Sequence, residues 1–241
     1  MSRDDVLREL ELLPMWKLRM PKREATELAM PVLVAQEIFS DPNDKFARVS
    51  SIAKMDWDAL QKCVKDCKSC NLATTRIQTV FGVGGQGAEW LFVGDAPDVD
   101  EDKQGEPFVG QAGKLLDNML AAIDLKRGEN VYIAYALKCK APQNIDPYDD
   151  EIQQCASFLK RQVALIQPKL IVALGKLATQ SLLNTSEPMD ALRGKLHEYE
   201  SHQRIVPVVV TYAPDDLLRN LPDKAKAWED LQLAEKTMKG L

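Results

Sequence analysis

Hydrophobic residues alternate between continuous runs and helically spaced positions from about residue 55 onward. Four runs, 89–95, 131–138, 169–175 and 204–212, are typical of strands buried on both faces. Helical spacing appears between and after them, in 110–125, 146–168, 176–183 and 223–238. Strands alternating with helices predict a three-layer α/β/α domain around a central, mostly parallel four-stranded sheet.

The first 55 residues follow a different pattern. Residues 1–21 carry spaced leucines and one tryptophan in a short amphipathic segment, whereas 22–55 show no sustained period and contain turn formers and charges. Asp56 is a plausible helix N-cap. We therefore expect an N-terminal partner-binding peptide (1–21), a linker or docking segment (22–55) and a folded domain (56–241). The glycine-rich GVGGQG (82–87) precedes a strand and is expected to form a turn rather than a phosphate loop.

Composition and charge narrow the function classes. The chain has 241 residues, a formal net charge of -5 and five cysteines. An acidic balance does not indicate a nucleic-acid binder. The sequence lacks a signal-peptide pattern and an apolar run of bilayer length, so we expect a cytoplasmic protein without membrane contact. Thiols stay reduced in that compartment, which favours ligands or buried thiols over disulfides.

Four of the cysteines form two pairs. Cys67 and Cys70 form a C-x2-C pair, Cys139 ends the second predicted strand, and Cys155 lies on the helix that follows. Four thiolates from two segments suit either a structural zinc ion or an iron–sulfur cluster, and the spacing alone leaves both open. Cys63 extends the first pair to C-x3-C-x2-C, the spacing of radical-SAM enzymes, but those enzymes have more βα units than this chain. We expect Cys63 to be a thiol on a helix face.

One long motif resembles a known family. The segment GDAPDVDEDKQGEPFVGQAGKLLDNML (94–120), KCKAP around Cys139, VALG (172–175) and APDDLLR (213–219) are similar to the iron–sulfur, family-four type of uracil-DNA glycosylases. The resemblance covers roughly residues 67–219. It implies a uracil-DNA glycosylase-like fold with a [4Fe–4S] cluster held by Cys67, Cys70, Cys139 and Cys155.

The residues that carry the family's chemistry are changed. Phe108 matches the aromatic on which the flipped base stacks, but Asp95 replaces a glutamate and Asp98 replaces a glycine. Tyr135 stands where the family has the asparagine that reads the base, and Ala213 stands where it has a histidine that stabilises the leaving group. We interpret Asp95, Phe108, Tyr135 and Ala213 as a vestigial glycosylase pocket with no catalytic residues. The alternative is a divergent uracil-DNA glycosylase of base-excision repair that uses Asp95.

The N-terminal peptide carries a second resemblance. LRELELLPMWKLRMP (7–21) is similar to the N-terminal peptide of the psi subunit of the bacterial DNA polymerase III clamp loader, matching its Trp-x-Leu-Arg-x-Pro with Trp16, Leu18, Arg19 and Pro21. The tail from Asn220 to Met238 also resembles that subunit.

This second resemblance implies a non-catalytic psi-type accessory subunit in DNA replication. Leu10, Leu13, Trp16, Leu18 and Arg19 would bind the clamp-loader ATPase subunits. The body would bind the chi subunit, which links to single-stranded-DNA-binding protein. The competing interpretation is that Trp16 and its leucines pack on the protein's own core.

Overall fold

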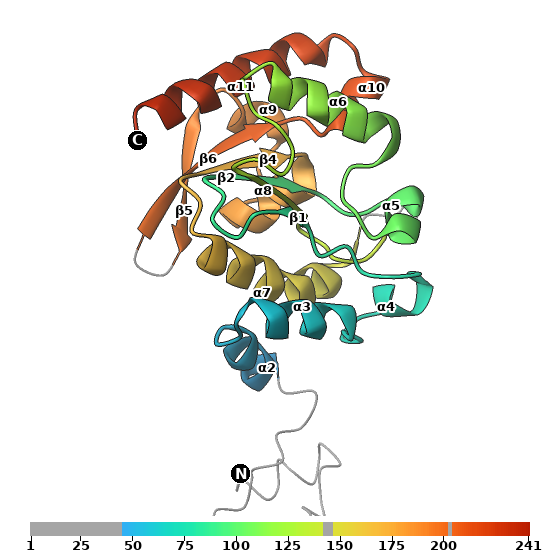
Figure 1. The fold of residues 1–241 in the computed structure, drawn as a ribbon. Coiled ribbons are helices and arrows are strands. Elements are labelled where there is room, and N and C mark those ends of the chain that lie inside the picture. The colour runs from blue at the N-terminus through green and yellow to red at the C-terminus, as the bar shows by residue number, and fades with distance from the viewer. Residues whose placement is uncertain (1–44, 142–146, 202–203) are drawn as a thin grey trace, which may run out of the picture. The chain divides into compact units, whose positions relative to one another are not determined.

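The computed structural model describes residues 45–141, 147–201 and 204–241, and all of them belong to one compact unit, Ser40–Leu241. Its centre is a six-stranded sheet in the order β1-β3-β2-β4-β6-β5 (Figure 1). The strands are β1 (Val83–Gly84), β2 (Trp90–Gly94), β3 (Val131–Tyr135), β4 (Leu170–Leu174), β5 (Leu196–Ser201) and β6 (Arg204–Thr211).

The four predicted strands form the parallel centre of this sheet, in the order β3-β2-β4-β6. The predicted α/β fold is confirmed. The sequence analysis missed both edge strands, which run antiparallel to their neighbours. β1 lies inside the glycine-rich segment that we expected to form a turn. β5 alternates exposed and half-buried residues, so it lacks the continuous apolar run by which the central strands were recognised.

Helices cover both faces of the sheet (Figure 1). One face packs on α6, α10 and α11, and the other on α7, α8 and α9. A third cluster of buried residues joins α2, α3 and α4 to α7. The helices are α2 (Lys45–Ile52), α3 (Trp57–Lys65), α4 (Leu72–Thr75), α5 (Val99–Gln104), α6 (Gly110–Ala121), α7 (Asp149–Ile166), α8 (Lys176–Leu183), α9 (Met189–Leu192), α10 (Pro214–Arg219) and α11 (Asp223–Lys239). Helix α2 lies in a segment that we expected to be a loop.

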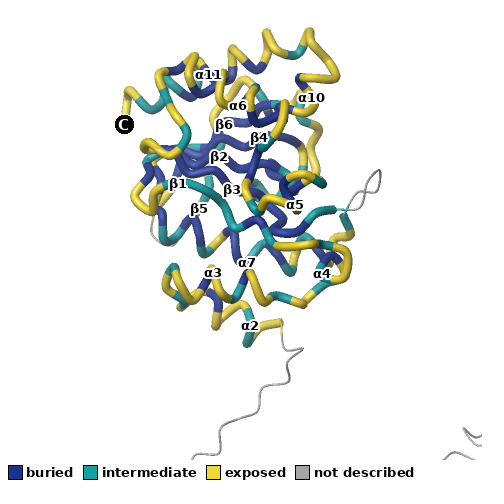
Figure 2. Tube along the Cα trace, turned by 45° about the vertical axis from the view of Figure 1, so that its right-hand side comes forward, coloured by how far each residue is buried: buried dark blue, intermediate teal, exposed yellow. Residues whose placement is uncertain are grey.

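Alternating residues of each central strand point to opposite helical layers. In β2, Trp90 and Phe92 face α6 and α11, whereas Leu91 and Val93 face α7 and α8. Every residue of β2, β3 and β4 is buried, as the dark central band of Figure 2 shows. Burial on both faces is the reason that these strands read as continuous apolar runs.

The strand order reverses between β2 and β4. From β2 the chain crosses to β3 on one side and later to β4 on the other, so the loops that leave β2 and β4 diverge. Ligands of open α/β sheets bind in the crevice outside the carboxyl ends of strands at such a point. Gly94 ends β2 there, in register with Tyr135 of β3 and Leu174 of β4.

The predicted N-terminal peptide lies outside the described residues, as does most of the predicted linker. The domain boundaries at residues 21 and 55 therefore stay predictions. Among the described helices, none combines the length and the apolar character that crossing a bilayer requires.

Candidate active site

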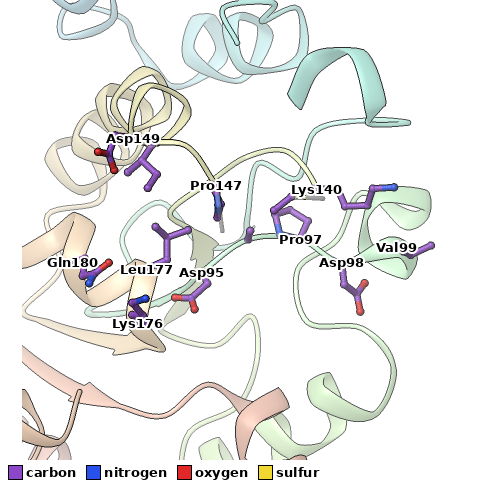
Figure 3. A pocket seen from close by; sticks show the side chains of 13 residues that line it. Asp95, Pro97, Asp98, Val99, Lys140, Pro147, Asp149, Lys176, Leu177 and Gln180 are labelled. Carbon is purple, nitrogen blue, oxygen red and sulfur yellow. The ribbon is translucent and has the colours of Figure 1, made fainter. Parts of the chain in front are cut away.

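A cavity of about 500 Å³ opens where the strand order reverses (Figure 3). The loop after β2 forms one wall and the start of α8 another, while the segment after β3 and the first turn of α7 close the rest. Its charged lining residues carry both signs and are Asp95, Asp98, Lys140, Asp149 and Lys176. The cavity therefore lies where the topology predicts a ligand site.

Asp95 is the carboxylate nearest the end of β2. One of its oxygens accepts a hydrogen bond from the backbone N–H of Ala178, at 2.7 Å, in the first turn of α8. Gly175 lies against the same carboxylate: its φ is +105°, and a Cβ there would be 2.6 Å from Asp95 Oδ2. The pKa of Asp95 is raised to about 7, mainly by burial and in smaller part by the nearby Asp216, against the lowering effect of the N–H groups at the start of α8.

Phe108 and Tyr135 lie in direct contact. Their ring centroids are 4.8 Å apart at an interplanar angle of 35°. Both side chains are buried and pack against Gly94, where a Cβ would be 2.5 Å from Phe108 Cζ and 2.7 Å from Tyr135 Cε1. The structure thus brings the predicted stacking aromatic and the residue at the predicted base-reading position together at the end of β2.

Glu101 connects these residues, and the sequence analysis assigned it no role. Its Oε1 accepts a hydrogen bond from the Tyr135 hydroxyl at 2.6 Å, and its Oε2 accepts one from the backbone N–H of Asp98 at 2.8 Å. Asp98 in turn accepts from the N–H of Glu101, which completes a capping box at the start of α5. The sequence signal was present, because Asp98 and Glu101 have capping-box spacing. Asp98, which replaces a glycine of the family pattern, caps this helix and also lines the cavity.

Arg127 is a second residue that the sequence analysis missed. Phe108 adopts the left-handed backbone region with φ of +53°, which is rare for a bulky residue. Arg127 donates hydrogen bonds to the carbonyls of Pro107 and Phe108, at 2.7 and 3.0 Å. Its Nε also donates to Asp117 at 2.9 Å. This guanidinium therefore holds the strained turn that presents the Phe108 ring.

Ala213 is the N-cap residue of α10, directly after β6, at the same edge of the sheet as Asp95 and Tyr135. It brings no polar side chain to the site. Two acids follow in the first turn of α10: Asp216 contributes to the raised pKa of Asp95, and Asp215 contributes to that of Tyr135. The carboxyl edge of the sheet is accordingly acidic around Ala213.

The four predicted cysteine ligands gather beside α7. Cys139 and Cys155 are buried in the cluster that joins α7 to α3 and α4, and Cys67 and Cys70 pack against that cluster. The pKa of Cys155 is raised to about 12, mainly by burial, and the nearby thiols of Cys139 and Cys70 contribute to the rise. Cys63 also packs there, on α3, as expected of a thiol on a helix face.

Within the described ranges, no three His, Cys, Asp or Glu side chains are grouped closely enough to hold a metal ion. Two arginines approach the sulfurs. Arg76 donates to Cys139 Sγ at 2.9 Å, and Arg48 lies 3.8 Å from Cys67 Sγ. Cationic donors of this kind stabilise thiolates, so the donor set fits a thiolate-bound metal group.

The predicted partner-binding residues Leu10, Leu13, Trp16, Leu18 and Arg19 lie outside the described residues. Their interactions, and any partner of the body, stay predictions.

Comparison with known proteins identifies relatives across most of the domain. The Uracil DNA glycosylase superfamily profile matches residues 81–232. A Type-4 uracil-DNA glycosylase of Archaeoglobus fulgidus is 42% identical over 165 residues, covering 67% of this chain and 82% of the relative. Those of Sulfurisphaera tokodaii and Thermotoga maritima are 38% and 35% identical, covering 72% and 73% of this chain and 81% and 91% of the relatives.

These relatives correct two expectations. The assignment to a psi-type clamp-loader subunit is wrong, because five relatives at 30% identity or more carry the name Type-4 uracil-DNA glycosylase instead. The expectation of a non-enzyme is overturned by the same relatives, which are named as enzymes. The short N-terminal motif and the substitutions at Tyr135 and Ala213 are weaker indicators of function than the long motif at 94–120. The chain belongs to the uracil DNA glycosylase superfamily.

Proposed function

We propose that this chain is a DNA-repair glycosylase that removes uracil from DNA. The observation that carries the proposal is Asp95, a carboxylate with a pKa of about 7 beside the cavity at the reversal of strand order. The Type-4 names of the relatives supply the substrate. Phe108 supplies an aromatic ring next to the same strand end, and stacking on such a ring is how flipped bases are held.

The reaction is a hydrolysis. Water forms a bond from its oxygen to C1′ of the deoxyribose, the C1′–N1 bond breaks, and uracil leaves with the bonding electron pair. In our proposal the Asp95 carboxylate orients this water and accepts its proton. Asp95 then releases that proton to solvent, and the uracil anion takes a proton from solvent. Only the ionised form can accept the proton, so the rate should rise with pH through about 7.

The leaving group receives less help here than in the family pattern. Ala213 provides no donor where the pattern has a histidine. Loss of one donor that stabilises developing charge typically lowers a rate by about 100- to 1000-fold. We therefore propose slow excision.

The test is excision from single- and double-stranded DNA containing one uracil, with matched thymine and cytosine strands. Intact protein should release uracil alone, and Asp95→Asn should lower the rate at least about 100-fold. Asp58→Asn makes the same change at an exposed position on α3 and should leave the rate unaltered. Uracil strands that keep their uracil after long incubation with excess intact protein would refute the function.

We also propose that Cys67, Cys70, Cys139 and Cys155 hold a [4Fe–4S] cluster. The convergence of the four thiols and the donation from Arg76 to Cys139 support it. When bound, the cluster would supply covalent links between α7, the end of β3 and the segment before α4. Protein purified without oxygen should contain iron and acid-labile sulfide, which Cys155→Ser should lose and Cys63→Ser retain. Zinc without sulfide in the intact protein would contradict the cluster.

A further inference from the structure

Tyr135 ends β3 at the carboxyl edge of the sheet, in register with Gly94 at the end of β2. It is only 3% exposed. Its hydroxyl donates to Glu101 Oε1 at 2.6 Å and accepts from the backbone N–H of Phe108 at 3.0 Å. The buried hydroxyl oxygen of Tyr135 therefore provides a hydrogen-bond partner both for the Glu101 carboxylate and for the N–H of Phe108.

The walls around the phenol ring are held by other parts of the chain. The Phe108 ring forms one wall, and its turn is fixed by the hydrogen bonds of Arg127 to two backbone carbonyls. Gly94 forms the floor, where any Cβ would collide with the Phe108 and Tyr135 rings. Glu101 is also fixed independently, through its bond to the N–H of Asp98. The slot should therefore keep its shape when the phenol is removed.

The phenol has the size and the hydrogen bonds of a small pyrimidine. Both are flat six-membered rings, and uracil has a carbonyl beside a ring N–H. That carbonyl could accept from the N–H of Phe108 while the ring N–H donates to Glu101. We infer that Tyr135 is a resident stand-in for a base: it closes a pyrimidine-sized slot against Phe108, and its removal opens that slot to free uracil. The choice of uracil rests on the proposed function, whereas the slot itself rests on the contacts of Tyr135.

Closure by Tyr135 has a consequence for selectivity. A base that displaces the ring must replace both hydrogen bonds, because the buried N–H of Phe108 would otherwise lose its partner and Glu101 Oε1 would keep only the 3.3 Å bond from the N–H of Val109. Sites that require a hydrogen-bond pattern reject analogues that lack it far better than apolar pockets reject a change of size. Tyr135 thus acts as a specificity-determining residue.

The experiment measures thermal unfolding of Tyr135→Ala with four small molecules. Phenol and uracil should raise Tm. Benzene has no hydrogen-bonding group and 1,3-dimethyluracil has no N–H, so both should raise it much less. Intact protein should respond to none of the four. Equal shifts with uracil and 1,3-dimethyluracil, or a uracil shift in intact protein as large as in the variant, would overturn the inference.

Tyr132→Ala is the matched control. Tyr132 is a fully buried tyrosine in the same strand, but it faces the opposite layer, and its hydroxyl lies 3.5 Å from Gln162 Nε2 rather than beside a carboxylate. Its cavity should not favour uracil over 1,3-dimethyluracil, and such a preference would count against the inference. Tyr135→Phe keeps the ring without the hydroxyl, so it should lower Tm and still exclude uracil; a uracil shift in this variant would also count against it.

Two further measurements remove ambiguity. Should Tyr135→Ala fail to fold alone, its refolding yield replaces Tm: recovery with phenol but not benzene supports the slot, and equal yields overturn it. Uracil excision is then compared between Tyr135→Ala and intact protein, with at least about a tenfold gain expected. Uracil binding to the variant without excision by either protein would refute the proposed function and leave the slot intact. Excision by intact protein without uracil binding to Tyr135→Ala would refute the slot and leave the proposed function intact.

Discussion

Asp95 combines two roles at the scale of a single side chain. It accepts the N–H of Ala178 at the start of α8, and its carboxylate lines the cavity. The hydrogen bond favours the charged form, but burial is the larger effect and raises the pKa to about 7. The same carboxyl group should therefore be visible both in catalysis and in the pH dependence of stability.

We expect the stability of the protein to fall between pH 5 and 8 because of Asp95. A carboxyl whose folded pKa lies above its unfolded value, near 4, stabilises the fold at low pH, and this contribution is lost as the pH rises through about 7. Asp95→Asn cannot titrate. The difference between the Tm of Asp95→Asn and the Tm of intact protein should therefore increase in favour of the variant from pH 5 to pH 8. The expected increase is at least about 2–4 °C, which is about 1 kcal/mol at this chain length. A Tm difference that does not change with pH would contradict the assignment.

Position 213 lacks the histidine that donates a hydrogen bond to the leaving group in the family pattern. Ala213→His places an imidazole at the N-cap of α10, at the edge of the sheet that carries Asp95. We expect kcat/KM for uracil excision to rise by at least about tenfold, with about 100- to 1000-fold as the upper range for one charge-stabilising donor. Ala213→Leu adds bulk without a donor and should not raise it. An equal effect of both variants would place the limiting step elsewhere.

The segment between α5 and α6 matters most at the scale of elements. It carries Phe108 in a strained backbone conformation and has no regular hydrogen bonding of its own around that residue. Arg127, from the turn before β3, provides the bonds that this turn lacks. The aromatic wall of the slot therefore depends on a cation that is 19 residues away in sequence.

Arg127→Met should destabilise the protein by about 1–3 kcal/mol, the range for buried hydrogen bonds to a charged group. Urea unfolding with an unchanged m value is the measurement. Lys126→Met is the matched control, because Lys126 is exposed and its described ion pair is with Glu129 on the surface. That change should stay within about 0.5 kcal/mol. Comparable losses in both variants would show that Arg127 does not hold the turn.

The elements that could be predicted from the sequence are those marked by a pattern within a single short segment. The central strands were predictable since burial on both faces leaves a continuous apolar run, as in Leu170–Leu174. Strand β1 has two residues, and β5 is half-exposed, so neither carries such a run. The same division holds in the site. Asp95 and Phe108 were found through a long motif, whereas Arg127 acts through contacts that no local pattern encodes.

The cysteines connect elements across the whole domain. Cys155 on α7 is buried, whereas Cys63 on α3 is half-exposed at the same cluster. Since the proposed cluster would link α7 to the end of β3, Cys155→Ser should lower Tm by about 4–8 °C more than Cys63→Ser, which is about 2 kcal/mol. Removal of iron from intact protein should bring its Tm toward that of Cys155→Ser. A cluster-independent role for Cys155 would leave Tm unchanged on iron removal.

The close approach of Gly175 to Asp95 has a consequence for how this sequence can change over generations. No side chain fits at residue 175 while the Asp95 carboxylate keeps its bond to α8, and the positive φ of Gly175 disfavours other residues even without it. A longer acid at 95 would need more room beside the same glycine. Residue 175 is therefore expected to stay glycine for as long as an acid occupies position 95, 80 residues earlier in the chain, whichever acid that is.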